Sequence, residues 1–144
     1  MFKRILVPTD GSEITGRAVA TAIGLARSLG AEIFTLCVKE PFPYGAVAEM
    51  QPTPPQEFFD AQERTAARNV GAVAEACAAA GVVCHPQTVE GVQPWEAIVA
   101  HASAQQCDLL VMGSHGRSGL ASLFLGSETN DVLKHTTVPV LVVR

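Results

Sequence analysis

The chain has 144 residues, of which 48% are hydrophobic and 17% are charged, and its formal net charge is -4. This length suits a single domain, residues 1–144, with a core of useful size. The negative charge and the absence of any Lys/Arg cluster argue against a nucleic-acid partner. No apolar run approaches the roughly 20 residues that span a bilayer, and residues 1–11 have no signal-peptide core. We therefore expect a cytoplasmic protein without a membrane partner.

The four cysteines do not predict a metal site or a disulfide framework. They are Cys37, Cys77, Cys84 and Cys107, and no two of them form a C-x-x-C pair. A zinc site needs clustered ligands, and disulfides are rare in the cytosol. We expect these side chains to be small buried hydrophobic groups that stay reduced.

The first part of the chain predicts a β-α-β unit. Residues 3–8 form a short apolar strand, and the turn residues 9–12 precede a helix whose apolar side chains recur at steps of three and four. Gly30 ends this helix, and residues 32–38 are a second strand rich in β-branched and aromatic side chains. Such a unit implies parallel strands joined by a right-handed crossover. Residues 39–56 then form a proline-rich loop, which packs either as a flap or against a partner.

The rest of the chain repeats the alternation of helix and strand. A long helix over 57–80 leads to a strand over 82–89, where Pro86 indicates an edge position or a bulge. A helix begins at Pro94, and a buried strand covers 108–112. The last helix, 127–135, is expected to turn Val132 and Leu133 inward before a final strand over 139–143.

This order of elements predicts an α/β fold, a three-layer doubly wound domain with a five-stranded parallel sheet. Placing the first strand centrally gives the strand order 3-2-1-4-5, with the winding direction reversed between strands one and four. Ligands of such sheets bind in the crevice at the carboxyl ends of the strands where the winding reverses. The loops expected there are residues 8–11 and 112–114.

Glycines gather after the fourth predicted strand. Gly113, Gly116 and Gly126 are followed by Ser127, which opens a predicted helix. Backbone N–H groups in such a loop, together with a helix N-terminus, suit a phosphate. The same glycines equally suit a tight turn and a helix entry, so spacing alone leaves both interpretations open. Neither the Walker-type loop nor the G-x-G-x-x-G dinucleotide fingerprint is present.

These residues resemble the universal stress protein family of the ATP-binding type. Its motif G-x2-G-x9-G-[ST] is matched from Gly113 to Ser127, and the opening ILVPTDGS and the closing VPVLVV are similar to the family's first and last strands. The resemblance covers essentially the whole chain. It implies a Rossmann-like fold of the adenine nucleotide alpha hydrolase kind. It also implies a dimeric stress-response or regulatory protein that binds ATP, AMP or another adenine nucleotide.

The resemblance also implies a set of site residues. Asp10 would serve the ribose hydroxyls or a phosphate-bound Mg²⁺ or Mn²⁺, because a carboxylate accepts hydrogen bonds and binds hard cations. Arg117 would either meet a phosphate oxygen or remain a solvated loop residue. Glu128 departs from the family, in which an apolar residue is common at this position, and a glutamate here would repel a triphosphate. The full implied nucleotide site comprises Pro8, Thr9, Asp10, Val38, Met112, Gly113, Ser114, Gly116, Arg117, Gly126, Ser127 and Thr129.

The sequence contains no complete catalytic set. Ser114 and His115 are neighbours whose side chains are expected to diverge, and His101 and His135 are expected at a surface or a helix end. We therefore expect a binding protein with at most weak ATP hydrolysis. An alternative is a regulator that binds no nucleotide and acts through its dimer surface and the proline-rich loop.

The C-terminal strand predicts the protein partner. Residues 138–143 are apolar and uncharged, and an exposed sheet edge of this kind invites pairing. In the family this strand pairs antiparallel with its copy, so the resemblance implies a homodimer through Val138 to Val143. The alternative is a monomer in which a helix or the proline-rich loop covers the edge.

Overall fold

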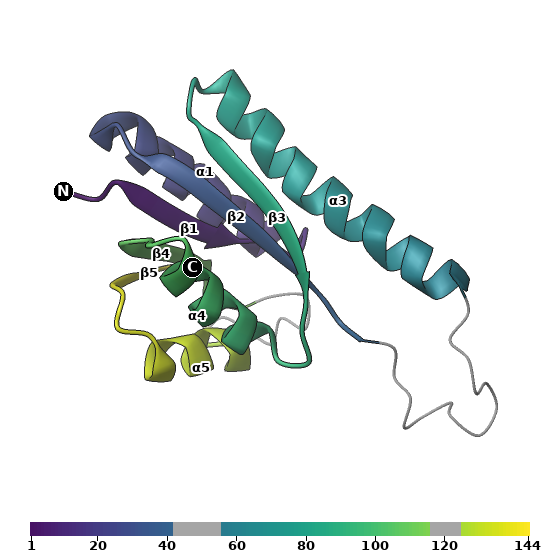
Figure 1. The fold of residues 1–144 in the computed structure, drawn as a ribbon. Helices are drawn as coiled ribbons and strands as arrows, with labels where there is room; N and C mark the ends of the chain where they lie inside the picture. Colours follow the sequence, from purple (N-terminus) through teal and green to yellow (C-terminus); the bar gives the residue numbers. More distant parts are fainter. Residues whose placement is uncertain (42–55, 116–124) are drawn as a thin grey trace.

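The computed structural model describes residues 1–41, 56–115 and 125–144, and it contains a parallel sheet between two layers of helices (Figure 1). The sheet has five strands in the order β3-β2-β1-β4-β5. This order confirms the doubly wound α/β topology that the sequence predicts. The strands are β1 (Arg4–Pro8), β2 (Glu32–Lys39), β3 (Cys84–Glu90), β4 (Leu109–Gly113) and β5 (Val140–Val143).

In the described parts of the chain, four helices cover the two faces of the sheet. On one face lie α1 (Glu13–Leu29) and α3 (Gln56–Ala79), and on the other lie α4 (Pro94–Ala104) and α5 (Ser127–His135) (Figure 1). Side chains of each strand alternate between the faces, so Ile5 and Val7 join the core beneath α1 and α3, while Leu6 joins the core beneath α4 and α5. All three of these side chains are fully buried, which places β1 at the centre of the molecule.

The ends of α1 follow ordinary capping chemistry. The Ser12 hydroxyl accepts a hydrogen bond from the Thr15 N–H, and Gly30 ends the helix in the left-handed conformation at φ 65°. Glu13 adds a negative charge to the first turn, where it is favourable to the helix dipole. The start of α1 is therefore fixed directly after the loop that leaves β1.

Pro86 lies in an edge strand, which is one of the two positions that the sequence indicates. It pairs in register with Thr35 of β2, and β3 has no other neighbour in the sheet. A proline is tolerated there because the outer side of an edge strand needs no N–H donor. The strand begins at Cys84, two residues later than the sequence predicts, although the Val83 carbonyl already accepts a hydrogen bond from the Ile33 N–H of β2.

One side-chain prediction on the α5 face is wrong. Leu133 is 40% exposed, whereas its neighbour Val132 is fully buried, because consecutive residues of a helix point about 100° apart. His101, expected at a surface or a helix end, lies in the last turn of α4, and its side chain is buried beside Ile98 and Ala102. The prediction of buried cysteines is confirmed for Cys37, Cys77 and Cys107, whereas Cys84 at the start of β3 is only partly buried.

None of the helices in the described ranges is long and apolar enough to cross a membrane.

Candidate functional site

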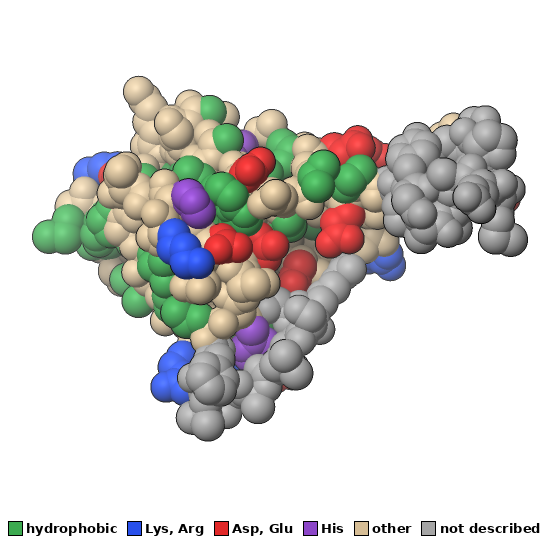
Figure 2. All heavy atoms as spheres, turned by 90° about the horizontal axis from the view of Figure 1, so that it is seen from below, with side chains coloured by type: hydrophobic (Ala, Val, Ile, Leu, Met, Phe, Trp, Pro, Cys, Tyr) green, Lys and Arg blue, Asp and Glu red, His purple; other side chains and the backbone are tan. Residues whose placement is uncertain are grey.

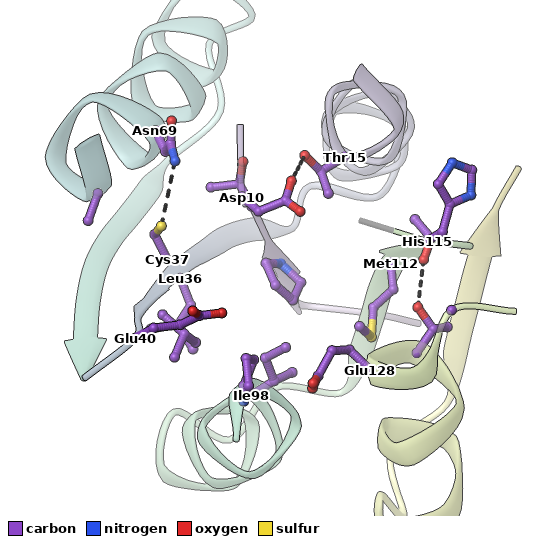
Figure 3. A pocket seen from close by; sticks show the side chains of 18 of the residues that line it. Asp10, Thr15, Leu36, Cys37, Glu40, Asn69, Ile98, Met112, His115 and Glu128 are labelled. Carbon is purple, nitrogen blue, oxygen red and sulfur yellow. Dashed lines mark hydrogen bonds between the residues drawn. The ribbon is translucent and has the colours of Figure 1, made fainter. Parts of the chain in front are cut away.

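A cavity of about 790 Å³ opens at the carboxyl ends of β1, β2 and β4. These strands are neighbours at the point where the winding of the sheet reverses, which is where ligands of open α/β sheets bind. Side chains from β2, α1, α3, α4 and α5 gather around the same space (Figure 3). Its volume lies within the range of ordinary small-molecule sites.

The loop after β1 supplies one wall of the cavity. Pro8, Thr9 and Asp10 all line it, as the resemblance implies. The Asp10 Oδ1 atom accepts hydrogen bonds from the Ser12 N–H at 2.9 Å and from the Thr15 hydroxyl at 3.0 Å. The carboxylate is thereby held at the start of α1 and oriented before any ligand arrives. This arrangement preorganises Asp10 for hydroxyl groups of a ligand.

The end of β4 and the start of α5 supply the facing wall. Met112, Gly113, Gly126, Ser127 and Thr129 line the cavity. The Thr129 hydroxyl donates to the Gly113 carbonyl at 2.8 Å and so joins the first turn of α5 to the end of β4. Gly126 is the N-cap of α5 and makes no side-chain cap, so no side chain of the described residues caps the N-terminal N–H groups of this helix.

The glycines Gly113 and Gly126 are explained by packing within the protein. A Cβ on Gly126 would lie 3.0 Å from the Cα of His115, and one on Gly113 would lie 3.1 Å from the Ile14 side chain. Such contacts are tighter than side chains normally tolerate. For these two positions close packing is therefore a sufficient reason for glycine, and the phosphate role stays a prediction.

Ser114 and His115 are placed differently from the prediction. Their side chains do not diverge, because the Ser114 Oγ and the His115 Nδ1 lie 3.2 Å apart, within hydrogen-bonding distance. The chain leaves β4 at Gly113, so the alternation of a strand no longer applies to the next two residues. Ser114 is buried and does not line the cavity, whereas His115 does. Gly116 and Arg117 lie outside the described residues.

The second strand and α3 add residues that the sequence reasoning missed. Val38 lines the cavity as expected, next to Cys37. From α3, Gln62, Thr65 and Asn69 also line it, and the Asn69 amide donates to the Cys37 Sγ at 3.7 Å (Figure 3). These three polar residues recur at steps of three and four on one helix face. That spacing was a usable signal, because it puts polar groups on the inward side of a helix.

The charged residues of the cavity wall are mostly acidic. Asp10, Glu40 and Glu128 line the cavity, and Lys39 forms an ion pair with Glu63. Figure 2 shows Asp and Glu side chains gathered in the middle of the face seen from below Figure 1. Among the described residues no group of three His, Cys, Asp or Glu side chains is placed to hold a metal ion. A divalent cation would therefore depend on ligands from a bound phosphate.

The fold and the cavity define a doubly wound α/β protein with a cavity at its switch point. The model of the universal stress protein family matches residues 1–144, and the chain belongs to this family. It is 35% identical over 145 residues to the universal stress protein MJ0531 of Methanocaldococcus jannaschii, covering 100% of this chain and 83% of that one. It is 36% identical over 144 residues to a universal stress protein of Thermus aquaticus, covering both chains completely.

Solved structures agree with this family membership. The protein MJ0577 superimposes with a TM-score of 0.83 and 30% identity, covering 99% of this chain and 96% of that one. A universal stress protein in complex with cAMP superimposes with a TM-score of 0.75 and 25% identity, covering 99% and 97%. The universal stress protein from Archaeoglobus fulgidus in complex with dAMP has the same fold, with a TM-score of 0.72 at 17% identity over 99% and 98%.

Proposed function

We propose that this chain is an adenine-nucleotide-binding universal stress protein, and that the nucleotide occupies the cavity at the carboxyl ends of β1, β2 and β4. The cavity itself carries the proposal, because it brings together Pro8–Asp10, Val38, Met112–Gly113 and Gly126–Thr129 from four distant parts of the chain. The complexes of two structural neighbours with cAMP and dAMP support it.

The base would lie on the apolar side of the cavity. Leu36, Val38, Ile98 and Met112 line this side, and Leu36 and Ile98 are nearly or fully buried. A flat apolar slot of this kind suits an adenine ring, which buries its faces and needs few polar partners. Backbone groups at the end of β2 would contact the edge of the ring.

The ribose and phosphates would lie between the two walls. Asp10, oriented by Ser12 and Thr15, would accept hydrogen bonds from the ribose hydroxyls. The uncapped N-terminus of α5 would face a phosphate, since its N–H groups and its dipole both favour an anion. Mg²⁺ or Mn²⁺ would enter with the phosphates.

Isothermal titration of the full chain with adenosine, AMP and ATP, each with and without Mg²⁺, tests this proposal. We expect saturable binding of at least one of these ligands. The variant Asp10→Asn keeps an Oδ1 acceptor for Ser12 and loses the charge, so we expect the fold to persist and the affinity to fall about tenfold. Asp60→Asn, on the exposed start of α3, is the matched control and should bind as the wild type does. Absence of binding by all three ligands would contradict the proposal.

We further propose that the chain works as a cytoplasmic homodimer. β5 is the last strand of the sheet, on the opposite edge from β3, and Leu141 is 38% exposed on it. Residues Val138 to Val143 offer an apolar edge that a second copy would pair with antiparallel, which would remove the exposed edge. Light scattering after size-exclusion chromatography measures this directly, and a single monomeric peak at high protein concentration would contradict it.

A further inference from the structure

Glu128 is held in a fixed position between two helices. It lies in the first turn of α5 and lines the cavity, and its Oε2 atom accepts a hydrogen bond from the Trp95 backbone N–H at 2.7 Å. Trp95 directly follows Pro94, the first residue of α4. The Gln93 N-cap of α4 makes no side-chain cap hydrogen bond. Glu128 therefore caps α4 from a neighbouring helix.

This contact weakens one of the helix N-termini at the cavity as a place for an anion. Pro94 and Ile98 place the start of α4 on the cavity wall, next to the start of α5. The partial positive charge of α4 now faces the Glu128 carboxylate, so it is partly cancelled for any ligand. The start of α1 also reaches the cavity through Thr15, but there the Asp10 carboxylate already accepts hydrogen bonds. Among the described residues the N-terminus of α5 remains for phosphate, and Glu128 is part of that same turn.

Among the described residues, the other charges of the cavity wall do not offset Glu128. Asp10 and Glu40 line the cavity as well, and the ammonium group of Lys39 is already paired with Glu63. Repulsion between a fixed carboxylate and a ligand grows with each negative charge that the ligand carries nearby. One phosphate can be held by the N–H groups of α5, whereas a chain of three brings additional charge toward the carboxylates.

We propose that Glu128 is a specificity-determining residue that limits the number of phosphates, so that the cavity selects a nucleoside or nucleoside monophosphate over the triphosphate. This inference rests on the proposed function of the cavity. Glu128 acts through its charge, and the hydrogen bond to Trp95 keeps that charge beside the phosphate end of the site.

Competition between ligands in the wild type and in Glu128→Gln tests the inference. Glutamine keeps an oxygen that accepts from the Trp95 N–H and removes the charge. Without Mg²⁺, we expect the wild type to bind AMP about tenfold or more tightly than ATP, since each tenfold step corresponds to about 1.4 kcal/mol. Glu128→Gln is expected to raise ATP affinity about tenfold and to change adenosine affinity less than about twofold.

Glu40→Gln is the matched control, because it removes a cavity carboxylate from the end of β2 and leaves α4 and α5 unchanged. It should leave the ratio of ATP to AMP affinity closer to the wild-type value than Glu128→Gln does. Thermal denaturation of each variant verifies that it is folded. If AMP binds and the ratio is the same in wild type and Glu128→Gln, the role of Glu128 is refuted while the nucleotide site stands. If no adenine compound binds to the folded wild type, both proposals fail.

Discussion

Replacement of Gly11 by alanine tests how the loop after β1 is built. Gly11 has a φ of +79°, a conformation that costs a residue with a side chain about 1–2 kcal/mol. An added Cβ would also lie 2.6 Å from the Asn69 Oδ1 atom and 3.0 Å from its Cγ. The substitution therefore combines backbone strain with crowding against α3.

The two costs can be given separate magnitudes. Backbone strain contributes about 1–2 kcal/mol, and overpacking against Asn69 adds about 1–3 kcal/mol. For a chain of this size 1 kcal/mol corresponds to a shift of about 3 °C, so the Tm of Gly11→Ala should fall by about 6–15 °C. Of the two costs, only the crowding depends on the Asn69 side chain. In the background of Asn69→Ala the same substitution should lower the Tm by only about 3–6 °C.

Thermal denaturation of the four proteins of this double-mutant cycle, followed by circular dichroism, gives the comparison. Gly24→Ala is the matched control, because a Cβ at Gly24 in the middle of α1 meets nothing within 4 Å. It should raise the stability by about 0.5–1 kcal/mol, as alanine does in a helix interior. An equal loss for Gly11→Ala with and without Asn69 would refute the crowding argument. No loss in either background would refute the argument from φ as well.

Three further predictions concern protonation and assembly. Burial lowers the pKa of His101 from 6.5, so the unfolded chain takes up a proton first as the pH falls below about 6.5, and the folded state loses stability. In a pH series of denaturation midpoints, the midpoint should depend less on pH for His101→Gln than for the wild type. The same pH dependence in both proteins would contradict this. Burial raises the pKa of Cys77 to about 12 and that of Cys107 to about 11, so both thiols should react slowly with a disulfide reagent at pH 8. The stability of the folded state should also decline above pH 9, where the thiols of the unfolded chain lose their protons. Labelling of the folded protein as fast as in denaturant would contradict the slow reaction. Leu141→Lys places a charge on the β5 edge and should convert the proposed dimer to a folded monomer in light scattering; an unchanged dimer mass would show that another surface makes the contact.

The fold could be predicted from the sequence because each element carries its own periodic pattern. Short apolar runs such as Leu109–Met112 end in glycine and become buried strands, and helices with apolar side chains at steps of three and four cover them. The prediction placed the first strand at the centre of the sheet, and this position requires one reversal of winding. The full burial of Ile5, Leu6 and Val7 agrees with the central position. Local pattern and overall topology agree in this chain.

The predicted residues that line the cavity lie at the ends of strands and at the start of α5. Thr9, Asp10 and Met112 follow or end apolar strands, so topology alone brings them together. Asn69 was missed because it sits in the middle of a long helix, and the sequence does not say which turn of α3 reaches the strand ends. The expectation for Ser114 and His115 was wrong because it extended strand geometry beyond the end of β4.

The partner of Glu128 could not be predicted from the sequence at all. Glu128 and Trp95 are separated by 33 residues, and their contact depends on how α4 and α5 pack against each other. The sequence indicated that a glutamate at this position would repel phosphate, and it did not indicate what holds the side chain in place. The structure shows that the Glu128 carboxylate accepts a hydrogen bond from the Trp95 N–H at the start of α4.

Amide chemical-shift mapping with AMP is the most direct test of the central claim that the cavity is a nucleotide site. The account predicts saturable shifts concentrated in residues 9–11, 38–40, 112–113 and 126–129, with weak or absent shifts at the far end of the sheet around Cys84. The same titration of Asp10→Asn should need about tenfold more AMP for half saturation. Absence of saturable shifts, or shifts centred away from the carboxyl ends of β1, β2 and β4, would contradict the account.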